Sequence, residues 1–498
     1  MIQVILQGHK NIYDTRELTK LFISEVEIIE STDQPSEKKD YVISRLGKDQ
    51  QGNLQAFARG DMEGRAAEYQ IAVKEPEENL SSREKTLVYD KNQREALRSC
   101  LFMVLKDLTG KKPVWGIFTG IRPVKIVQNM LEASRNYDEI FQELTREKFL
   151  DQDKAQLLID IAKKERELIY PLEQRAVNLY ISIPFCPSRC FYCSFPSNDL
   201  YRKEGEVDQY LTELIKELKA SITIINREKI KVNTLYVGGG TPSILRREQF
   251  EALFSALQEL DQYSDLKEIT VEAGRPDTFS VEVLKCLKER GVGRISLNPQ
   301  TMNEKTLVAI GRKHTPQEIH KAYDMIREVG FESVNMDLII GLPGETLESL
   351  GHTLEEIGKL QPENLTVHTL AVKTNSYFKE HQELLTLGER GVLQMLDKVE
   401  AFTNRHQYIP YYMYRQKNML GNFENVGYSK KGRESLYNMK IMAEKETILG
   451  FGAGAVSKVV NLKTDEVKRV PNIKGLGHYM DRIEEALEKK EEILKNFY

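Results

Sequence analysis

The sequence predicts an α/β protein built around a partial (β/α)6 barrel, with an N-terminal α+β domain before it and a small C-terminal α/β extension after it. From residue 177 onward, short β-rich runs alternate six times with helical stretches, which is the pattern of parallel strands joined by right-handed crossovers. The chain has 498 residues, which is more than one domain usually holds. We therefore expect domains at 1–170, 171–385 and 386–498.

The N-terminal region combines strand and helix patterns but shows no motif that assigns it a role. Residues 2–7 and 67–75 read as strands, and the charged segment 31–40 between them reads as a loop. The run 92–110 reads as a helix that ends at Gly110, since glycine commonly follows the last turn of a helix. A further helix is expected over 153–169, leading into the barrel.

The central region repeats one unit, a strand followed by a helix. The strand-like runs are 177–183, 233–237, 268–272, 294–297, 334–340 and 365–370, and the helical stretches lie near 207–222, 247–260, 280–290, a long region ending at 330, 347–360 and 390–405. Six such units make a barrel smaller than the eight-unit form. In barrels of this kind the active site lies at the C-terminal ends of the strands.

Polar and glycine-rich residues follow the predicted strands at that end. A cysteine-rich loop follows the first strand and GGGTPS, residues 238–243, follows the second. Asn298 follows the fourth strand, and segment 370–376 follows the sixth. Because parallel strands end at one rim, we expect these residues to meet there.

The loop after the first strand holds Cys186, Cys190 and Cys193 in the spacing C-x3-C-x2-C. Three thiolates can bind three irons of a [4Fe-4S] cluster and leave the fourth iron open, whereas most clusters have four cysteine ligands. A disulfide framework is disfavoured by the odd total of 5 Cys. Structural zinc needs four ligands, and the next histidine after the loop is His314. Cys100 and Cys286 are expected to pack as small apolar side chains.

The residues around this loop offer the groups that a cofactor with nucleoside and amino-acid parts requires. Three consecutive glycines, residues 238–240, let backbone approach a ligand closely. Carboxylates accept hydrogen bonds from ribose hydroxyls or an ammonium group, and arginine binds a carboxylate through two parallel bonds. The candidates are Glu272, Gln300, Arg312 and Asp337. Each of them alone is more often part of a structural ion pair.

Composition limits the classes of partner. The net charge of -4 predicts no nucleic-acid partner, because no basic face is implied. No apolar run is long enough for a membrane helix, and the first residues do not resemble a signal peptide. Free thiols and an exposed cluster fit a reducing compartment, so we expect a cytoplasmic protein.

Five motifs give the chain a family resemblance. In order and spacing, YISIPFCPSRCFYCSF, GGGTPS, EITVEA, RISLNPQTM and NMDLIIGLPGET resemble the radical-SAM oxygen-independent coproporphyrinogen III oxidases over residues 175–460. The additional N-terminal domain and its FTGIRP run are similar to the long coproporphyrinogen dehydrogenase branch, the HemZ type.

This resemblance implies cofactors and residue roles. Cys186, Cys190 and Cys193 would bind a [4Fe-4S] cluster, and S-adenosyl-L-methionine would bind as two molecules or over two turnovers. The implied cofactor contacts are Tyr180, Tyr192, Gly239, Gly240, Thr241, Glu272, Gln300, Arg312, Asp337 and Ala371.

The implied reaction converts propionates of coproporphyrinogen III, a tetrapyrrole, to vinyl groups, giving protoporphyrinogen IX in haem biosynthesis. The implied electron donor has a low potential, as flavodoxin or ferredoxin does, and the protein would be a monomer. The resemblance assigns no other catalytic residue.

Two departures from the oxidase pattern leave an alternative open. Ser182 replaces the histidine that usually precedes the IPFC segment, and Phe195 stands where oxidases carry a fourth cysteine. A phenylalanine there is common in haem chaperones of the same family, which bind and transfer haem without decarboxylation. Such a chaperone needs an axial ligand, for which His314 and His368 are candidates. An enzyme that acts on another tetrapyrrole is a third possibility.

Overall fold

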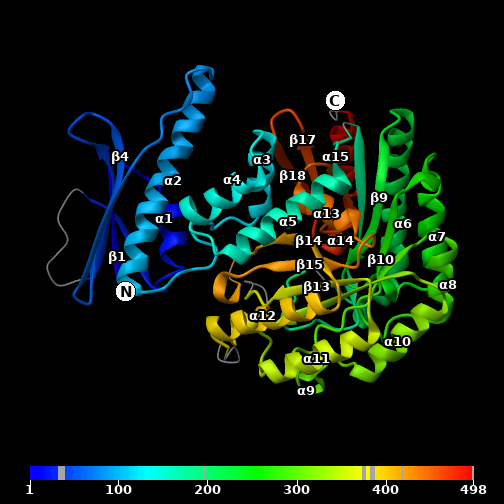
Figure 1. Cartoon of the computed structure of the whole chain (residues 1–498). Helices are drawn as coiled ribbons and strands as arrows, with labels where there is room; N and C mark the ends of the chain where they lie inside the picture. The colour runs from blue at the N-terminus through cyan, green and yellow to red at the C-terminus, as the bar shows by residue number, and fades with distance from the viewer. Residues whose placement is uncertain are drawn as a thin grey trace. The chain divides into compact units, whose positions relative to one another are not determined.

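The computed structural model describes residues 1–31, 40–173, 175–195, 198–372, 377–381, 387–417 and 419–495 (Figure 1). The chain forms two compact units, Met1–Ile159 and Asp160–Tyr498. Most of the expected loop at 31–40 lies outside the described residues, as do residues 373–376 of the segment after the sixth predicted strand.

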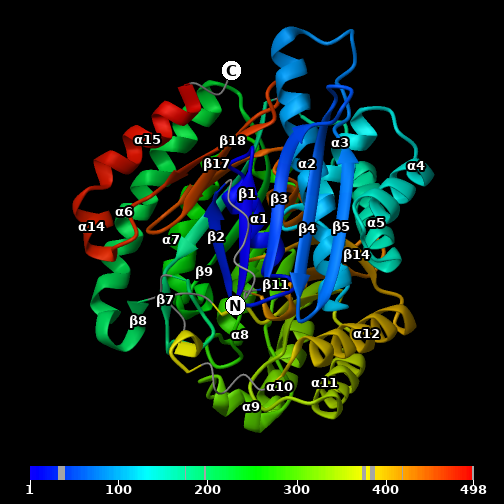
Figure 2. The ribbon, with the colours of Figure 1, turned by 90° about the vertical axis from the view of Figure 1, so that its left-hand side faces the viewer.

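The N-terminal unit is built on a five-stranded sheet of order β2-β1-β3-β4-β5, seen face-on in Figure 2. Its strands are β1 (Ile2–Gln7), β2 (Val26–Glu30), β3 (Tyr41–Lys48), β4 (Leu54–Met62) and β5 (Arg65–Ala72). β1 runs parallel to β2 and β3, and the remaining pairs are antiparallel. Helix α1 (Ile12–Thr19) follows β1, and helix α2 (Ser82–Thr109) packs on β4 and β5.

Helix α2 ends as the sequence predicts but begins earlier. Gly110 follows its last turn at φ +68°, a left-handed conformation that glycine adopts without strain. At the other end, Ser81 and Glu84 form a reciprocal capping box that starts the helix ten residues before the expected position. Cys100 on this helix is fully buried, and burial raises the pKa of its thiol to about 12. It therefore packs as an apolar side chain, as expected.

The rest of the N-terminal unit is helical. It contains α3 (Pro123–Glu132), α4 (Tyr137–Gln142), a π-helical turn (Glu143–Glu147) and α5 (Gln152–Ile169), which continues into the second unit. Trp115 precedes α3 and is 1% exposed.

The second unit contains the predicted partial barrel. Its strands β6 (Ala176–Ile183), β9 (Lys231–Gly239), β10 (Glu268–Glu272), β11 (Arg294–Ser296), β12 (Ser333–Ile340) and β13 (Asn364–Thr369) are neighbours in chain order and all parallel. The intervening helices, which cover the outer face of the sheet in Figure 1, are α6 (Leu200–Arg227), α7 (Arg247–Leu257), α8 (Val281–Glu289), α9 (Glu304–Ala309), α10 (Pro316–Glu328) and α11 (Leu347–Leu360), with α12 (Glu389–Arg405) after β13. The predicted fold class is confirmed.

The long helical region expected between the fourth and fifth strands is two helices. Asn303 caps α9, and Thr315 with Pro316 starts α10 through a new capping box. Between them, Gly311 adopts φ +75°, which turns the chain sharply. The break places Arg312 at the C-terminal end of the barrel.

C-terminal strands extend the barrel sheet to eleven strands, on both sides. On one side, β15 (Asn425–Ser429) pairs antiparallel with β13, and β14 (Ile409–Tyr414) pairs antiparallel with β15. On the other side, β16 (Thr447–Phe451) pairs parallel with β6. β17 (Val456–Asn461) pairs antiparallel with β16, and β18 (Glu466–Pro471) pairs antiparallel with β17. Helices α13 (Leu436–Ala443), α14 (Leu476–Asp481) and α15 (Ile483–Lys495) complete the unit, with α14 and α15 packed on α6.

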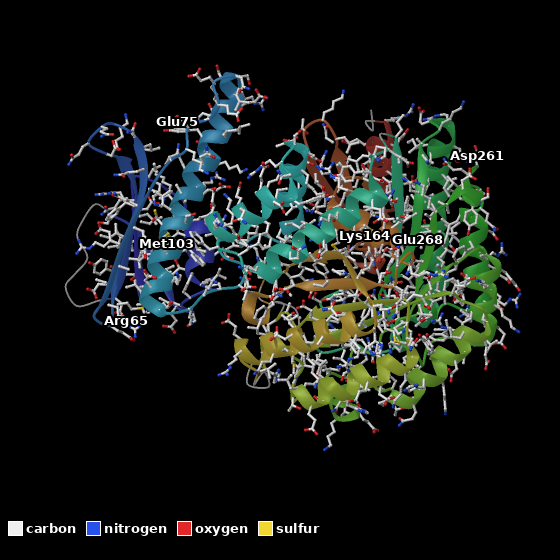
Figure 3. All side chains as sticks on the ribbon, viewed as in Figure 1. Arg65, Glu75, Met103, Lys164, Asp261 and Glu268 are labelled. Carbon is white, nitrogen blue, oxygen red and sulfur yellow. The ribbon has the colours of Figure 1, made fainter. Side chains whose placement is uncertain are left out.

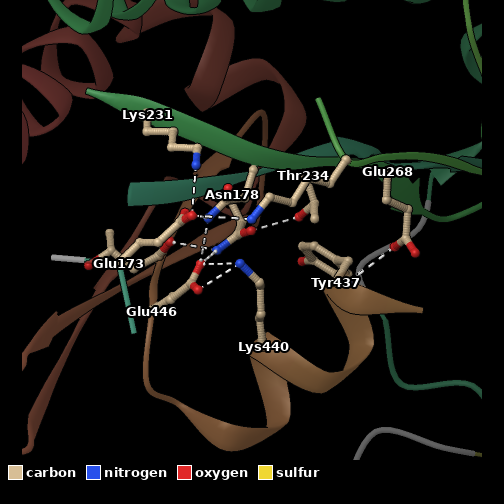
Figure 4. Close-up of polar contacts among 11 residues, drawn as sticks. Glu173, Asn178, Lys231, Thr234, Glu268, Tyr437, Lys440 and Glu446 are labelled. Carbon is tan, nitrogen blue, oxygen red and sulfur yellow. Dashed lines mark hydrogen bonds and ion pairs between the residues drawn. The ribbon is translucent and has the colours of Figure 1, made fainter. Parts of the chain in front are cut away.

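A buried polar network closes the barrel at the N-terminal ends of its strands (Figure 4). Asn178 of β6 donates to Glu446 (3.0 Å) and accepts a hydrogen bond from Thr234 of β9 (2.8 Å). Lys440 of α13 donates to both carboxylate oxygens of Glu446 (2.6 Å each). Lys440 and Glu446 are both buried, so this pair fixes α13 against the barrel floor. On the outer surface of the unit, Asp261 is exposed (Figure 3).

Candidate functional site

The three clustered cysteines line one cavity, of about 80 Å³, at the C-terminal ends of the barrel strands. After β6 the chain enters a short strand, β7 (Phe185–Cys186), which pairs with β8 (Asn198–Asp199). The N–H of Cys193 donates to the carbonyl of Cys190 (3.1 Å), which makes a tight turn between the last two thiols. All three cysteines are free thiols.

The thiols suit a multi-iron cluster better than a single ion. Among the described residues, no three His, Cys, Asp or Glu side chains are grouped closely enough to hold one metal ion. A four-iron cluster makes a different demand, because each thiolate binds a different iron. Burial raises the pKa of Cys186 to about 11. A hydrogen bond from Thr241 Oγ1 to the sulfur of Cys186 (3.4 Å) opposes this rise but does not cancel it. Cluster binding would therefore displace a proton from this thiol.

The cysteine loop is fixed to the neighbouring loops by backbone bonds at Phe191. Its N–H donates to the carbonyl of Ile310 (3.1 Å), and its carbonyl accepts from the N–H of Tyr377 (3.0 Å). The Phe191 ring lies against Tyr377 at 4.6 Å between centroids and against Gly311, where a Cβ would come within 3.1 Å of the ring. Residues far apart in the sequence thus hold the loop at the barrel rim.

The glycine turn after β9 packs against the cysteine loop. A Cβ on Gly240 would lie 2.5 Å from the carbonyl oxygen of Phe185, and Gly239 adopts φ +116°. The N–H groups of Gly240 and Thr241 donate to Ile183 (2.9 Å) and Phe185 (2.8 Å). The sequence predicted close approach of this turn to a ligand. In the structure the nearest neighbour of Gly240 is protein backbone, although Gly240 also lines the cavity.

Arg312 lies beside the cysteines with its charge buried. Its guanidinium donates to the hydroxyl of Tyr192 (3.0 Å) and to the carbonyls of Asn298 (2.8 Å) and Gly274 (3.3 Å). Only 7% of the residue is exposed. No carboxylate of the described residues forms an ion pair with Arg312, so a bound anionic group would meet a fixed, desolvated positive charge.

Arg275 is a second buried arginine of the cavity and is not among the site residues predicted from the sequence. It pairs with Asp277 through two bonds (3.1 and 3.0 Å) and donates to the Ser188 hydroxyl (2.8 Å) in the cysteine loop. It is 4% exposed. The GRP run after β10 was the available signal, but an arginine there is indistinguishable by sequence from a surface charge.

Glu272 ends β10 and faces both the cavity and a group of stacked tyrosines. It accepts a hydrogen bond from Tyr236 (2.6 Å), and burial raises the pKa of its carboxyl to about 7. The rings of Tyr236 and Tyr437 stack at 4.4 Å, and Tyr180 stacks on both at 6.2 and 6.4 Å. Tyr180 therefore lies in the barrel interior, within this stack.

Gln300 lies beside β12, the fifth strand of the barrel, which contains Asp337. Gln300 adopts φ +68°, and its N–H donates to the carbonyl of Asp337 (2.9 Å). Burial alone would raise the pKa of Asp337, but hydrogen bonds from neighbours that include His368 outweigh it and hold the pKa below its usual range. The side-chain oxygens of Gln300 and Asn298 are buried acceptors without a hydrogen-bond partner in the described residues. Asn298 lines the cysteine cavity, so its oxygen is available to a hydroxyl or ammonium donor of a ligand.

The cavity gathers most of the predicted site residues but not all of them. It is lined by Cys186, Cys190, Cys193, Tyr192, Gly240, Thr241, Glu272 and Arg312. Five predicted contacts do not line it: Tyr180, Gly239, Gln300, Asp337 and Ala371. Ala371 instead forms an isolated backbone bridge with Met419 after β13.

The two positions that depart from the oxidase pattern differ in their surroundings. Ser182 is buried and donates to the carbonyl of Ala453 (3.2 Å) beyond β16. Phe195 is 56% exposed, an unusual degree for so large an apolar ring.

Comparisons with known proteins agree with this geometry. Residues 180–357 match the model of the Radical SAM superfamily. The chain is 35% identical to the oxygen-independent coproporphyrinogen-III oxidase-like protein HemZ of Bacillus subtilis, over 97% of this chain and 95% of that protein. It is 34% identical to the heme chaperone HemW of the same organism, over 61% of this chain and 76% of HemW.

A solved structure, the coproporphyrinogen III oxidase HemN of Escherichia coli, matches with 25% identity and a TM-score of 0.49, covering 65% of this chain and 72% of HemN. No helix among the described residues has the length and apolar character needed to cross a membrane.

The chain therefore belongs to the oxygen-independent coproporphyrinogen III oxidase family of radical SAM proteins, in its HemZ-type branch. The cofactors that this superfamily implies are a [4Fe-4S] cluster and S-adenosylmethionine.

Proposed function

We propose that the chain catalyses the oxidative decarboxylation of two propionate side chains of coproporphyrinogen III, giving protoporphyrinogen IX. The observation that carries the proposal is the cavity lined by three free thiols and two buried arginines at the active end of a radical SAM barrel. The match to the HemZ-like protein over nearly its whole length supports the same assignment.

The chemistry requires a hydrogen atom to be removed from an unactivated carbon. Each turnover changes a –CH2–CH2–COO⁻ group into a vinyl group by loss of one hydrogen atom, CO2 and one electron, which an external acceptor takes up. When bound, the reduced cluster and S-adenosylmethionine supply this hydrogen abstraction. Two propionates then require two molecules of S-adenosylmethionine, bound together or used in successive turnovers.

Each residue of the site has a separate task in this proposal. Cys186, Cys190 and Cys193 hold the cluster, and Thr241 orients Cys186 through its hydrogen bond. Arg312 binds an anionic group of the cofactor, while Glu272 and Asp337 accept from its hydroxyl and ammonium donors. The remaining contacts that we assign to the cofactor are Tyr180, Tyr192, Gly239, Gly240, Gln300 and Ala371.

The proposal also defines partners. A low-potential electron donor such as flavodoxin or ferredoxin reduces the cluster, the tetrapyrrole is the substrate, and we place the protein in the cytoplasm as a monomer.

Haem transfer is the competing function, and two observations favour it. Phe195 presents an apolar ring to solvent where oxidases have a cysteine, and the heme chaperone HemW matches at 34% identity. Of the two candidate ligands, His314 is 3% exposed, and burial lowers its pKa to about 3. His368 contacts the Tyr414 hydroxyl (3.2 Å) and lies 3.8 Å from the Asp337 carboxylate.

An anaerobic assay distinguishes the two functions. The reconstituted protein is mixed with coproporphyrinogen III, S-adenosylmethionine and a reductant, and the porphyrin products are weighed by mass spectrometry. We expect two successive losses of formic acid mass (CO2 plus two hydrogens) with release of methionine and 5′-deoxyadenosine. Cys190→Ala should abolish both, whereas Cys286→Ala, in a buried cysteine of α8, should keep them. Stable haem binding without any mass change would establish the chaperone function instead.

A further inference from the structure

The N-terminal unit contains a cavity of about 470 Å³ that the proposed function does not use. Small-molecule sites commonly measure roughly 300–1,000 Å³. The walls come from α2, from α3, from the segment between them that includes the FTGIRP run, residues 118–123, and from residues 133–148 after α3. This run is the N-terminal motif to which the radical chemistry gives no task.

Positive charge exceeds negative charge in the walls of this cavity. Five cations and two carboxylates line it: Lys91, Arg98, Arg122, Arg135 and Lys148, with Glu95 and Glu143. Both carboxylates already have partners, because Lys148 contacts Glu95 (2.7 Å) and Glu143 (3.4 Å), and Arg135 also pairs with Glu143. The lining therefore holds three more cations than carboxylates.

Arg98 is a buried cation of the walls whose charge is opposed only at a distance, by Asp14 and by Glu95 of the cavity. Its guanidinium donates to the Thr119 hydroxyl (3.0 Å) and to the carbonyl of Ile117, and its buried Nε has no hydrogen-bond partner in the described residues. No carboxylate of the described residues forms an ion pair with it. Burial lowers the pKa of this guanidinium despite the charges of Asp14 and Glu95, and a bound acid group would offset the cost of burying it.

Part of the wall is apolar. Pro123, Ile126, Met130 and Ala133 follow one another at helical spacing along α3 and all line the cavity, so one face of this helix borders it. Phe118 adds an aromatic ring from the preceding segment. A simple inorganic ion would leave this wall unused.

We propose that the cavity of the N-terminal unit binds an organic anion with an apolar body. Its acid groups, carboxylate or phosphate, meet Arg98, Arg122 and Lys91, and its body lies against Ile126 and Met130 of α3. This site is separate from the cysteine cavity, and the proposal does not depend on the reaction catalysed there.

The full-length protein contains an intrinsic fluorophore in the same unit as this cavity. Trp115 is the single tryptophan of the chain, and it lies three residues before Phe118 of the cavity wall. Selective tryptophan fluorescence therefore reports on the N-terminal unit. The probes are coproporphyrin III, which carries carboxylates on an apolar ring, ATP, which carries phosphates on a heterocycle, and inorganic phosphate. Isothermal titration calorimetry gives the affinity and the number of sites for each.

We expect one of the two organic anions to bind at this site with a Kd below about 100 μM, and inorganic phosphate to bind far more weakly. Arg122→Gln and Lys91→Gln should each weaken that binding about 10-fold, the size expected for one charged hydrogen bond. Arg94→Gln, on an exposed position of α2 outside the cavity, should leave the affinity unchanged. The unfolding midpoint of each variant shows that the unit stays folded.

Binding of either organic anion at this site supports the proposal. Binding of coproporphyrin III identifies the ligand class as a tetrapyrrole carboxylate, and binding of ATP identifies it as a nucleotide. The proposal is overturned if neither binds, if inorganic phosphate binds as tightly as they do, or if Arg94→Gln weakens binding as much as Arg122→Gln. Coproporphyrin binding whose affinity Arg122→Gln leaves unchanged would come from the barrel and would contradict the proposal for this cavity.

Discussion

Glu272 ends β10 in the barrel interior, where burial raises the pKa of its carboxyl to about 7. In an unfolded chain the same group releases its proton near pH 4.5. The folded protein therefore holds more protons between these two values, and its stability falls as the pH rises from about 4.5 to 7. A protonated Glu272 can donate a hydrogen bond, whereas the ionised form only accepts.

Glu272→Gln should remove this pH dependence from the cofactor-free protein. Relative to wild type, the variant should gain on the order of 3 kcal/mol of unfolding free energy between pH 4.5 and 7.5. Denaturant titrations at several pH values measure the difference. Glu345→Gln should show a separate gain of similar size, because burial also raises the pKa of Glu345 to about 7, although Glu345 does not line the cysteine cavity. A pH-independent difference for Glu272→Gln would contradict the assignment.

At the scale of elements, the turn after β9 determines whether the cysteine loop can close. Gly240→Ala should prevent cluster loading, since its Cβ would lie 2.5 Å from the carbonyl oxygen of Phe185, a backbone atom that cannot move alone. Iron and sulfide content after anaerobic reconstitution measures the effect. Gly274→Ala in the same cavity should load normally, because its Cβ would have no neighbour closer than 3.7 Å. Equal iron content in both variants would refute the prediction.

Helix α15 is fixed to α6 by a buried ion pair. Lys490 contacts Glu217 at 3.1 Å, and both are almost fully buried. Glu217 also accepts from the Tyr479 hydroxyl (2.7 Å) and the N–H of Gly452 (2.9 Å), which connects α14 and the end of β16 to the same carboxylate.

Lys490→Met should lower the unfolding free energy by about 3–5 kcal/mol, because it leaves Glu217 buried without its counter-charge. Thermal and denaturant unfolding measure the loss. Lys489→Met changes the neighbouring residue, whose ammonium donates to the carbonyl of Pro471 at 3.4 Å, and should cost less than about 1 kcal/mol. Similar losses of unfolding free energy in the two variants would show that the Lys490–Glu217 ion pair does not stabilise the fold.

At the scale of the whole molecule, the chain divides into two compact units with separate sheets. All three cluster cysteines lie in the second unit, and Trp115 lies in the first. A ligand that binds only the folded form of one unit stabilises that unit by mass action. The cofactors should therefore act on one unit and not directly on the other.

Removal of the cluster by a chelator should lower the midpoint of far-UV circular dichroism melting while the midpoint of the Trp115 fluorescence transition stays within about 2 °C. The comparison uses anaerobically reconstituted and chelated samples of the full chain. Parallel shifts of both signals would mean that the two units unfold together.

The sequence predicted most of the fold because the barrel strands are short, buried and separated by strongly capped helices. The helix expected at 347–360 is α11, whose Thr346 cap is readable from local sequence. Local sequence patterns do not predict which strands pair when those strands are far apart in the chain. β16 joins β6 across more than 260 residues, and no local signal distinguishes its parallel pairing from that of a separate C-terminal sheet.

For the site, local sequence was enough to predict the cysteine loop, the glycine turn and the polar residues at the strand ends, because each of these features follows directly after a strand. Tertiary structure alone decided that Arg275 belongs to the cavity, that Gly240 packs against Phe185, and that Tyr180 and Tyr236 stack with Tyr437 of α13. The physical reason is that burial, charge pairing and ring stacking depend on distances between segments, which strand pairing and helix packing set and sequence spacing does not.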